Sequence, residues 1–412
     1  MKYSKMAWRN LWRRRRRTII TALSIGFGVM LAVTFTGTGD YAYTNMINTS
    51  AIMGLGHISV EPIGYNQTPA LDKKFAGAKQ IRERVLTIEG VNHAAVRIMG
   101  QAMMSSANKT IGGALLAIDP AQELLDKNLF IRSLIAGELF SGTANNGVIV
   151  GSKMADKLKI GLGKKLVYTT PDVRGEIVSE VARVAVIYTT GVDEVDGSLI
   201  LLPIDRVRGI LGYGDSDASL IAITVNDYRK TEKIRTTIMA DIKNKDVEVL
   251  SWRQTQTEMA SAIAMDRSSN YVSQVLVGLL IAAGILNTLL MSVLERTREF
   301  GIMLALGMSP WGLFRLVLTE SFWLAIIGLA VGCLITLPWY LYLFHVGIDF
   351  TETLGENYSA GGVLIDPVFK IRLFKESIIA ILIGVFSLTL LSGIYPAWRA
   401  GRIPPVESLK IM

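Results

Sequence analysis

The chain has 412 residues, of which 50% are hydrophobic, and its mean hydropathy of +0.37 exceeds that of ordinary soluble proteins, so membrane-spanning helices are expected. The formal net charge is +8, and residues 1–17 hold eight basic side chains and no acidic one, so the rest of the chain sums to zero. This distribution excludes a nucleic-acid-binding protein, which would spread basic residues over a folded face. The single cysteine, Cys333, excludes an intramolecular disulfide.

A basic segment that runs directly into an apolar one opens the chain. Trp8, Leu11 and Trp12 recur at helical spacing, which predicts a cytoplasmic interfacial helix in residues 1–17. Residues 18–39 are long and apolar enough for a first transmembrane helix. A cleaved signal peptide is disfavoured, because its apolar core would be shorter and would end in a small-x-small cleavage site.

The stretch from residue 40 to residue 270 is too long for a loop and predicts a domain of mixed α and β structure. Alternating or β-branched runs predict strands, and apolar residues at helical spacing predict helices. The predicted strands include 56–63 and 180–191, the predicted helices 76–90 and 229–242, and residues 148–170 predict strand, short helix, turn and strand. A further helix from about Ser251 should continue without interruption into the second transmembrane helix.

Three more apolar segments are long enough to cross a bilayer, at residues 271–294, 313–343 and 378–395. The segment 313–343 is longer than a bilayer requires, which predicts a tilt or a break near Pro338. The fold class expected from these segments is an α+β membrane protein, with four transmembrane helices and a large mixed α/β periplasmic domain between the first and second helices.

The orientation follows from the basic residues of the short flanking segments. Lys and Arg gather at the amino terminus, in the connection 295–312 and in the tail 396–412, which are therefore predicted to be cytoplasmic. Residues 40–270 and the loop 344–377 then lie on the outer side of the membrane.

Residue patterns for catalysis or metal binding are missing from the sequence. The three histidines, His57, His93 and His345, have no second ligand at zinc spacing, so no catalytic and no metal site is predicted. The acidic residues of "VDEVDG" could suggest a cation, but they lack the loop length of a calcium hand, which favours a turn between strands. The P-loop pattern G-x-x-x-x-G-K-[ST] is also missing, so any ATP must be bound by a partner.

The connection 295–312 carries charges of both signs beside apolar residues and small residues, which is typical of an amphipathic helix at the membrane surface. Spacing alone leaves two readings open, a link between two spans or a docking element for a cytoplasmic protein. The candidate docking residues are Glu295, Arg296, Arg298, Glu299, Gly301, Ala305 and Gly307.

Two motifs resemble those of a known family. "ERTREFGIMLALGMSPWGLFRLVLTES", from Glu295, resembles the cytoplasmic signature of FtsX-like ABC transporter permeases, with phenylalanine at position 300 where isoleucine is usual. "YPAWRAGRIPPVESLK", from Tyr395, is similar to the carboxy-terminal motif of the same family. Within the family, which also includes the MacB permeases, "GHISVEP" and "NGVIVGSKMADKLKIGLGKKL" look most like the lipoprotein-releasing (LolC/LolE-type) permeases.

This resemblance implies a permease subunit in the bacterial inner membrane that is not itself an enzyme. Two permease chains, identical or different, would pair with two copies of a cytoplasmic ATPase subunit that binds ATP and Mg²⁺, while this chain binds no cofactor. The segment from Glu295 to Gly307 would be the coupling helix that contacts the ATPase. Hydrolysis would then be relayed to the periplasmic domain by mechanotransmission, without a central channel.

The resemblance also implies an amphiphilic periplasmic substrate, most directly a lipoprotein that is extracted from the membrane and passed to a periplasmic carrier. A lipid-lined cleft for it needs apolar, adaptable side chains in the first two spans. The candidates for this cleft are Phe27, Met30, Phe35, Val275 and Leu279. Two alternatives stay open: MacB-like efflux of drugs or peptides with an adaptor protein, and FtsX-like regulation of a periplasmic cell-wall hydrolase.

Overall fold

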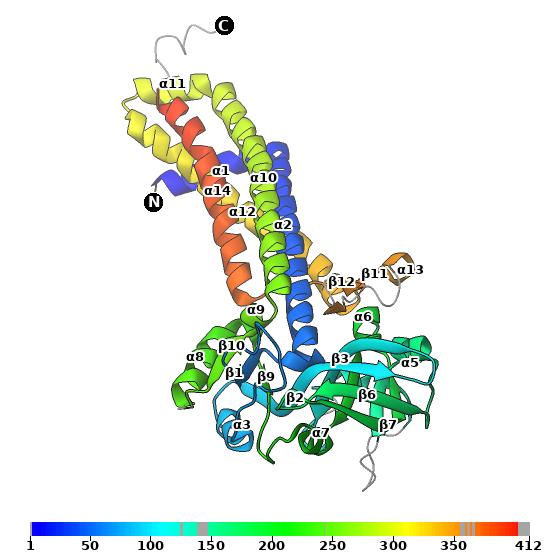
Figure 1. Ribbon diagram of the computed structural model, residues 1–412. Helices are drawn as coiled ribbons and strands as arrows, with labels where there is room; N and C mark the ends of the chain where they lie inside the picture. The colour runs from blue at the N-terminus through cyan, green and yellow to red at the C-terminus, as the bar shows by residue number, and fades with distance from the viewer. Residues whose placement is uncertain are drawn as a thin grey trace. The chain divides into compact units, whose positions relative to one another are not determined.

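The computed structural model describes residues 2–123, 127–137, 147–242, 244–354, 359–360, 363–364 and 367–402. The chain forms two compact units, which are described separately below (Figure 1). The helical unit comprises residues 1–42, 264–349 and 368–412, and the α/β unit comprises residues 43–263 and 350–367. The second half of the motif that begins at Tyr395 lies in residues 403–412, outside the described residues.

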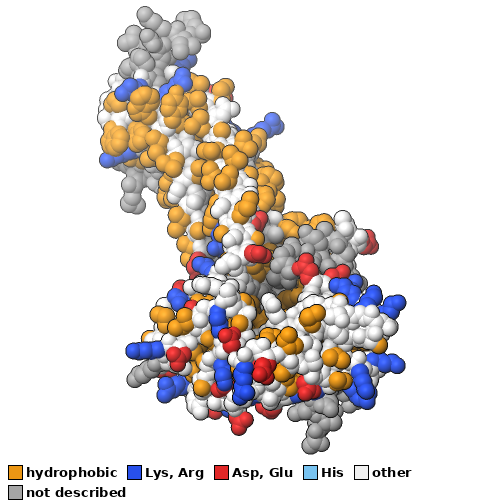
Figure 2. All heavy atoms as spheres, in the orientation of Figure 1, with side chains coloured by type: hydrophobic (Ala, Val, Ile, Leu, Met, Phe, Trp, Pro, Cys, Tyr) orange, Lys and Arg blue, Asp and Glu red, His pale blue; other side chains and the backbone are white. Residues whose placement is uncertain are grey.

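Four helices of the structure are long and apolar enough to cross a membrane. They are α2 (Arg15–Ser50, extended by the π-helical turn η1, Ala51–Leu55), α10 (Thr257–Glu295), α12 (Pro310–His345) and α14 (Lys375–Gly401). Two shorter helices belong with them, α1 (Lys2–Arg13) and α11 (Thr297–Ala305). Hydrophobic side chains cover much of the visible face of these helices in Figure 2, as expected for surfaces that contact lipid.

Helix α12 does not break at Pro338, so of the two predicted alternatives the break is wrong and the tilt stays a prediction. A proline removes one backbone hydrogen bond from a helix, and apolar helices in packed surroundings tolerate this loss. The next residue, Trp339, donates its indole N–H to Thr34 of α2 at 3.0 Å. The start of α12 is encoded locally, because Ser309 accepts a hydrogen bond from the backbone N–H of Gly312 at 3.1 Å and Pro310 occupies the first turn.

Helices α2 and α12 approach closely because glycines face each other at their crossing. A Cβ atom built on Gly26 would lie 3.2 Å from the Cα of Gly332. A Cβ on Gly332 would lie 2.9 Å from Val29, and one on Gly328 would lie 2.7 Å from Ile25. Gly328 and Gly332 are four residues apart, which is the small-xxx-small spacing that lets helix backbones meet in membranes.

The α/β unit is built on one ten-stranded sheet with the order β10-β1-β9-β2-β3-β8-β5-β7-β4, in which β6 pairs with both β2 and β7. Strands β2, β3, β8, β5, β7 and β6 therefore form a closed ring, and β9, β1 and β10 extend the sheet from β2. The strands are β1 (Ile58–Pro62), β2 (Val91–Ser105), β3 (Thr110–Ile118), β4 (Leu134–Gly137), β5 (Gly147–Gly151), β6 (Lys165–Pro171), β7 (Ile177–Tyr188), β8 (Leu199–Pro203), β9 (Leu220–Val225) and β10 (Val247–Ser251).

Short helices pack on this sheet and complete its hydrophobic core. They are α3 (Ala78–Leu86), α4 (Leu129–Arg132), α5 (Ser152–Leu158), α6 (Asp193–Asp196), α7 (Ile204–Leu211), η2 (Tyr228–Lys230), α8 (Thr231–Asp241) and α9 (Trp252–Thr255). The main cluster joins fully buried side chains from the sheet and the helices, such as Ile58, Val85, Leu166 and Ile223. Outside this sheet lie α13 (Thr351–Leu354) and two short strand pairs, β11 (Ile348–Asp349) with β14 (Val368–Phe369) and β12 (Ser359–Ala360) with β13 (Val363–Leu364).

The predicted fold class is confirmed, since a mixed α/β domain is inserted between the first and second of four apolar helices. The predicted strands 56–63 and 180–191 correspond to β1 and β7, and residues 148–170 form β5, α5 and β6 as expected. The predicted unbroken helix from Ser251 is wrong, because Gln256 has φ −126° and ψ 62° and separates α9 from α10. Helices α2 and α10 both extend beyond their predicted spans, and the membrane boundaries themselves stay predictions.

Candidate functional site

The candidate coupling site begins where α10 ends and α11 starts. Glu295 is the last residue of α10, and Arg296, with φ −108° and ψ 14°, interrupts the helix before α11 begins at Thr297. Gly307 follows α11 with φ +94°, a left-handed conformation that suits glycine after a helix end. A short helix is thus held between two long ones by a turn at each end.

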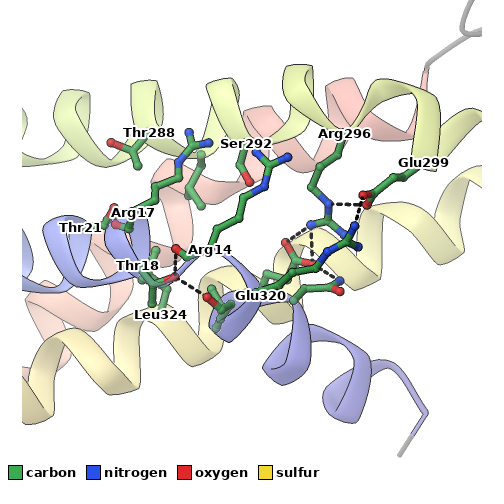
Figure 3. Close-up of a pocket in the computed structure, with 14 residues that line it drawn as sticks. Arg14, Arg17, Thr18, Thr21, Thr288, Ser292, Arg296, Glu299, Glu320 and Leu324 are labelled. Atoms are coloured by element: carbon green, nitrogen blue, oxygen red, sulfur yellow. Dashed lines mark hydrogen bonds and ion pairs between the residues drawn. The ribbon is translucent and has the colours of Figure 1, made fainter.

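Arg296 lies at the centre of a buried polar network (Figure 3). Its Nη1 donates to both carboxylate oxygens of Glu320 in α12, at 2.9 and 3.1 Å, and its Nε donates to Glu299 at 3.1 Å. Asn10 of α1 donates its amide N–H to the same Glu320 at 2.7 Å. The side chains of Arg296 and Glu320 are only 7% and 9% exposed, so this ion pair is shielded from solvent. The guanidinium also lies 4.8 Å from the centre of the Phe300 ring.

Sequence reasoning named Arg296 but missed Glu320 and Asn10. A signal for Glu320 existed, because a lone carboxylate inside an apolar segment calls for a partner. No comparable signal identified Asn10, which is 310 positions away from Glu320 in the chain.

Basic residues near the amino terminus contact the same junction from another side. Arg13 forms an ion pair with Glu299 at 3.2 Å, Arg17 forms one with Glu295 at 3.3 Å, and Arg14 also pairs with Glu295. Figure 3 shows Arg14 and Arg17 extending toward α10, which carries Thr288 and Ser292. Ion pairs therefore join the start of α2 to the end of α10.

A hydrophobic cluster packs beneath these ion pairs. Its buried members come from α1, α10, α11, α12 and α14, and they are Ala7, Val293, Phe300, Leu313, Leu316, Val317, Ala397 and Ala400. The family-like alanines of "YPAWRAG", Ala397 and Ala400, are thus packing residues of this end of the helical unit. The indole N–H of Trp323 donates to Ser4 at 3.1 Å, so this side chain joins α12 to α1.

The seven predicted docking residues divide into two groups. Glu295, Arg296 and Glu299 pair with other residues of the chain, as described above, and Gly301 is buried. The remaining three, Arg298, Ala305 and Gly307, are exposed.

Exposed apolar residues continue the outer face of α11, and sequence reasoning did not single them out. Ile302 is 43% exposed and Leu306 is 82% exposed. Together with Arg298 and Ala305, they give α11 an outward surface that is mostly apolar with a basic residue at one end.

A second feature of the helical unit is a cavity of about 300 Å³ between α2, α10 and α14. Its walls are mainly apolar and include Phe35, while Gln274 and Ser377 add polar groups. Gln274 donates to Thr36 at 3.3 Å. Of the predicted cleft residues, Phe35 lines this cavity, whereas Phe27, Met30, Val275 and Leu279 do not. A role for those four in a cleft shared with a second chain stays a prediction.

The polar residues considered in the α/β unit have structural environments. The carboxylate of Asp196, fully buried, accepts hydrogen bonds from the backbone N–H groups of Thr190 and Gly191 and from the hydroxyl of Thr189, so it fixes the turn before α6. Among the residues that the structure describes, no group of three or more His, Cys, Asp or Glu could hold a metal ion.

His57 is neutral and held in one orientation. Burial lowers its pKa to about 4. Its Nδ1 accepts from the backbone N–H of Val225 at 3.3 Å, which leaves Nε2 to donate to Asn48 at 2.9 Å. These contacts satisfy both ring nitrogens and support a structural role.

Comparison with known proteins identifies both parts of the chain. The family described as FtsX-like permease C-terminal matches residues 271–405, and the MacB-like periplasmic core domain matches residues 18–240. The chain is 23% identical over 380 residues to the lipoprotein-releasing system transmembrane protein LolC of Xylella fastidiosa, covering 81% of this chain and 87% of the relative. It is 23% identical over 415 residues to the macrolide export ATP-binding/permease protein MacB of Nitrobacter winogradskyi, covering 95% of this chain and 58% of the relative.

A solved structure of the periplasmic region of MacB from Actinobacillus actinomycetemcomitans matches 52% of the chain and 96% of that structure, with a TM-score of 0.36 and 12% identity. The membrane permeases among the relatives and the four apolar helices point to an inner-membrane protein. The chain therefore belongs to the ABC transporter permeases that combine a MacB-like periplasmic core domain with an FtsX-like permease domain.

Proposed function

We propose that the chain is the transmembrane subunit of a bacterial inner-membrane ABC transporter that extracts lipid-anchored proteins from the membrane. The relative LolC is named for lipoprotein release, and the match covers 87% of its length. Each CH₂ group of an acyl chain loses about 0.8 kcal/mol on leaving the bilayer, so extraction requires work from ATP. The apolar cavity between α2, α10 and α14 is a surface of the kind that an amphiphilic substrate would contact.

The ATPase would be a separate cytoplasmic subunit, present in two copies with a pair of permease chains. The 412 residues contain no P-loop pattern, so ATP and Mg²⁺ would be bound by that partner. The observation that carries this proposal is the outward face of α11, where Ile302 and Leu306 lie next to Arg298, because a contiguous exposed apolar surface is the kind of site that a partner protein contacts. The contact would involve this face and Arg298, while Glu295 and Glu299 would act inside the chain.

The proposed orientation has both termini in the cytoplasm and residues 40–270 in the periplasm. It is supported by the contacts of Asn10 with Glu320 and of Arg13 with Glu299, since these bring the basic amino terminus and α11 to the same end of the helical unit. Basic residues favour the cytoplasmic side, so one end of the unit carries both features expected there.

The test of this function is depletion of the chain in its native host. We expect lipoproteins destined for other compartments to accumulate in the inner membrane, and an ATPase subunit to co-purify with the tagged chain in detergent. Unchanged lipoprotein distribution would rule out the lipoprotein substrate, and a failure to recover any ATPase would rule out the transporter.

Efflux of small amphiphiles is the second candidate. The relatives described as macrolide exporters match 95% or more of this chain at comparable identity. Normal lipoprotein sorting together with increased sensitivity to drugs or peptides after depletion would favour this candidate, and a periplasmic adaptor in the purified complex would strengthen it.

A further inference from the structure

The five consecutive arginines near the amino terminus do not share one environment. Arg13 ends α1, Arg14 lies in the turn between α1 and α2, and Arg17 lies in the first turn of α2, and each pairs with Glu295 or Glu299 at the α10–α11 junction. Arg15 and Arg16 are exposed and make no ion pair in the part of the chain that the structure describes. The run is therefore divided by ion pairing into an inner group, which faces the junction although Arg13 itself is 71% exposed, and an outer group.

We propose that Arg13, Arg14 and Arg17 are positioning residues for the coupling helix, and that they clamp the α10–α11 junction to the amino-terminal helices. Motion of α11 is then transmitted to α2 as well as to α10 and α12. This inference rests on the proposed function, because it assumes that an ATPase acts on α11. It assigns the inner arginines a role distinct from setting topology.

The buried network supplies the first argument for the clamp. Glu320 accepts hydrogen bonds from both Asn10 and Arg296, so one carboxylate of α12 binds α1 and the start of α11 together. Glu299 is shared in the same way between Arg296 and Arg13. A displacement of α11 alone would break contacts to two other helices at once.

The distribution of charge supplies the second argument. If the run only bound anionic lipid, all five arginines would contribute, and it would not matter which of them pointed toward the protein. Instead, Arg14 and Arg17 converge on the single carboxylate of Glu295. The geometry thus predicts that substitutions in the inner group and in the outer group affect the motion of α10 differently, although they remove equal charge.

The experiment compares the double variant Arg14→Glu/Arg17→Glu with the matched control Arg15→Glu/Arg16→Glu. Both change the net charge equally, and all four positions lie in the first turn of α2 or directly before it. A third variant adds Glu295→Arg to the first pair, which restores opposite charges in exchanged positions. All are made in the full chain, purified with its ATPase and reconstituted in lipid nanodiscs.

The readout is the labelling rate of a cysteine introduced at Met265 of α10, which is 78% exposed, in a background in which Cys333→Ser removes the native thiol. A membrane-impermeant maleimide reports the change caused by ATP with vanadate. We expect the control to retain the nucleotide-dependent change, the inner double variant to lose it, and Glu295→Arg to restore it. Equal behaviour of the inner and outer variants, or no recovery with Glu295→Arg, would overturn the proposal.

A second measurement separates failure of the clamp from failure of the proposed function. The same variants, with Glu295→Arg alone to complete a double-mutant cycle, are compared by thermal unfolding of the full chain without ATPase. A favourable coupling between the inner arginines and Glu295 supports the clamp even where no ATPase binds the wild-type chain. Additive effects of the substitutions would reject it.

Discussion

Both units of the molecule contain a buried arginine–glutamate–asparagine cluster, and the two clusters differ in how completely they are shielded from solvent. In the α/β unit, Arg97 donates to both oxygens of Glu123 at 2.9 Å, and Asn128 donates to the same carboxylate at 3.0 Å. Arg97 also donates to the backbone carbonyl of Gly54 at 2.5 Å. The side chains of Arg97 and Glu123 are 3% and 0% exposed, so this cluster is sealed inside the fold.

The cluster of the helical unit is open on one side. Arg296 divides its donors between Glu320 and the partly exposed Glu299, which in turn meets Arg13 at the surface. The same set of residue types therefore serves a closed structural junction in one unit and a junction that reaches solvent in the other. A fully buried ion pair whose hydrogen bonds are all satisfied holds its segments in one arrangement. An arginine that divides its donors between two carboxylates instead joins segments that can exchange one of these contacts for the other.

The largest effect is expected from breaking the sealed pair. Arg97→Met should destabilise the full chain by about 3–5 kcal/mol, because it leaves the buried carboxylate of Glu123 without its counter-charge. Thermal unfolding in detergent measures the effect, and adding Glu123→Leu should recover part of it. As a control, Arg235→Met removes an ion pair with Glu232, whose side chain is 62% exposed, and a hydrogen bond to the backbone carbonyl of Val249, and should cost about 1–2 kcal/mol. Equal losses for the two arginine variants would contradict the comparison.

A smaller effect is expected in the open cluster. Glu320→Gln keeps a hydrogen-bond acceptor for Asn10 but removes the charge that faces Arg296, which retains Glu299 as a partner. We expect a loss of about 2–4 kcal/mol in unfolding free energy, together with loss of the ATP-dependent change in α10. A loss as large as that of Arg97→Met would show that the open cluster is as rigid as the sealed one.

The stability of the α/β unit should also depend on pH, because Glu61 ionises within the accessible pH range. Burial and the neighbouring Glu248, directly opposite in β10, raise the pKa of Glu61 to about 7 from its usual 4.5. The folded state thus binds more protons than the unfolded state between pH 4.5 and 7, so stability is present below that range and is lost as pH rises through it. Glu61→Gln should remove this loss and raise stability at pH 8 by on the order of 1–3 kcal/mol.

The ionisation of His57 changes stability with pH in the opposite direction, and it serves as an internal reference for the effect of Glu61. Its pKa is lowered to about 4, so the unfolded state gains a proton as pH falls below 6.5 and stability declines toward pH 4. This decline should be the same in wild type and Glu61→Gln, and their unfolding temperatures should converge near pH 4.5. A difference between the two proteins that did not change with pH would contradict the assignment.

The smallest effect on stability is expected on the outer face of α11. Leu306→Asp should change unfolding free energy by no more than about 0.5 kcal/mol, because Leu306 is 82% exposed. Recovery of the ATPase with the tagged chain should nevertheless fall sharply, as a charge is placed in the proposed interface. Lys375→Asp at the other end of the helices is the matched control and should leave recovery unchanged. Normal recovery with Leu306→Asp would exclude this face as the contact.

Local patterns in the sequence predicted much of the fold. The alternation in β7 and the helical spacing in α3 reflect one buried face of a single element, and this is visible within a few residues. The interruption at Gln256 has no such signature, because glutamine is compatible with a helix and the nearby contacts of Trp252 with Tyr43 and Ile47 join residues far apart in the chain.

The candidate site was only partly predictable for a similar reason. The charged residues after Glu295 are conspicuous in the sequence, but the direction in which each points depends on α1 and α12. Arg298 and Arg296 look equivalent in the sequence, and only the fold separates an exposed residue from one bound to Glu320. The five arginines are a stronger example, since a uniform run of one residue type carries no information about which members face inward.

The pairing of β1 with β10 determines how the α/β unit would respond to pulling. Ile58 lies opposite Ser251, so the chain enters β1 from α2 and leaves β10 toward α10 at the same end of this antiparallel pair. A force that separated the two helices would open the hydrogen bonds one after another from that end, as in a zipper, instead of loading them all together. The side-chain hydrogen bond between Ser50 and Gln256 and the cluster around Trp252 lie at the entrance to this pair. They are the first contacts that such a force would have to break.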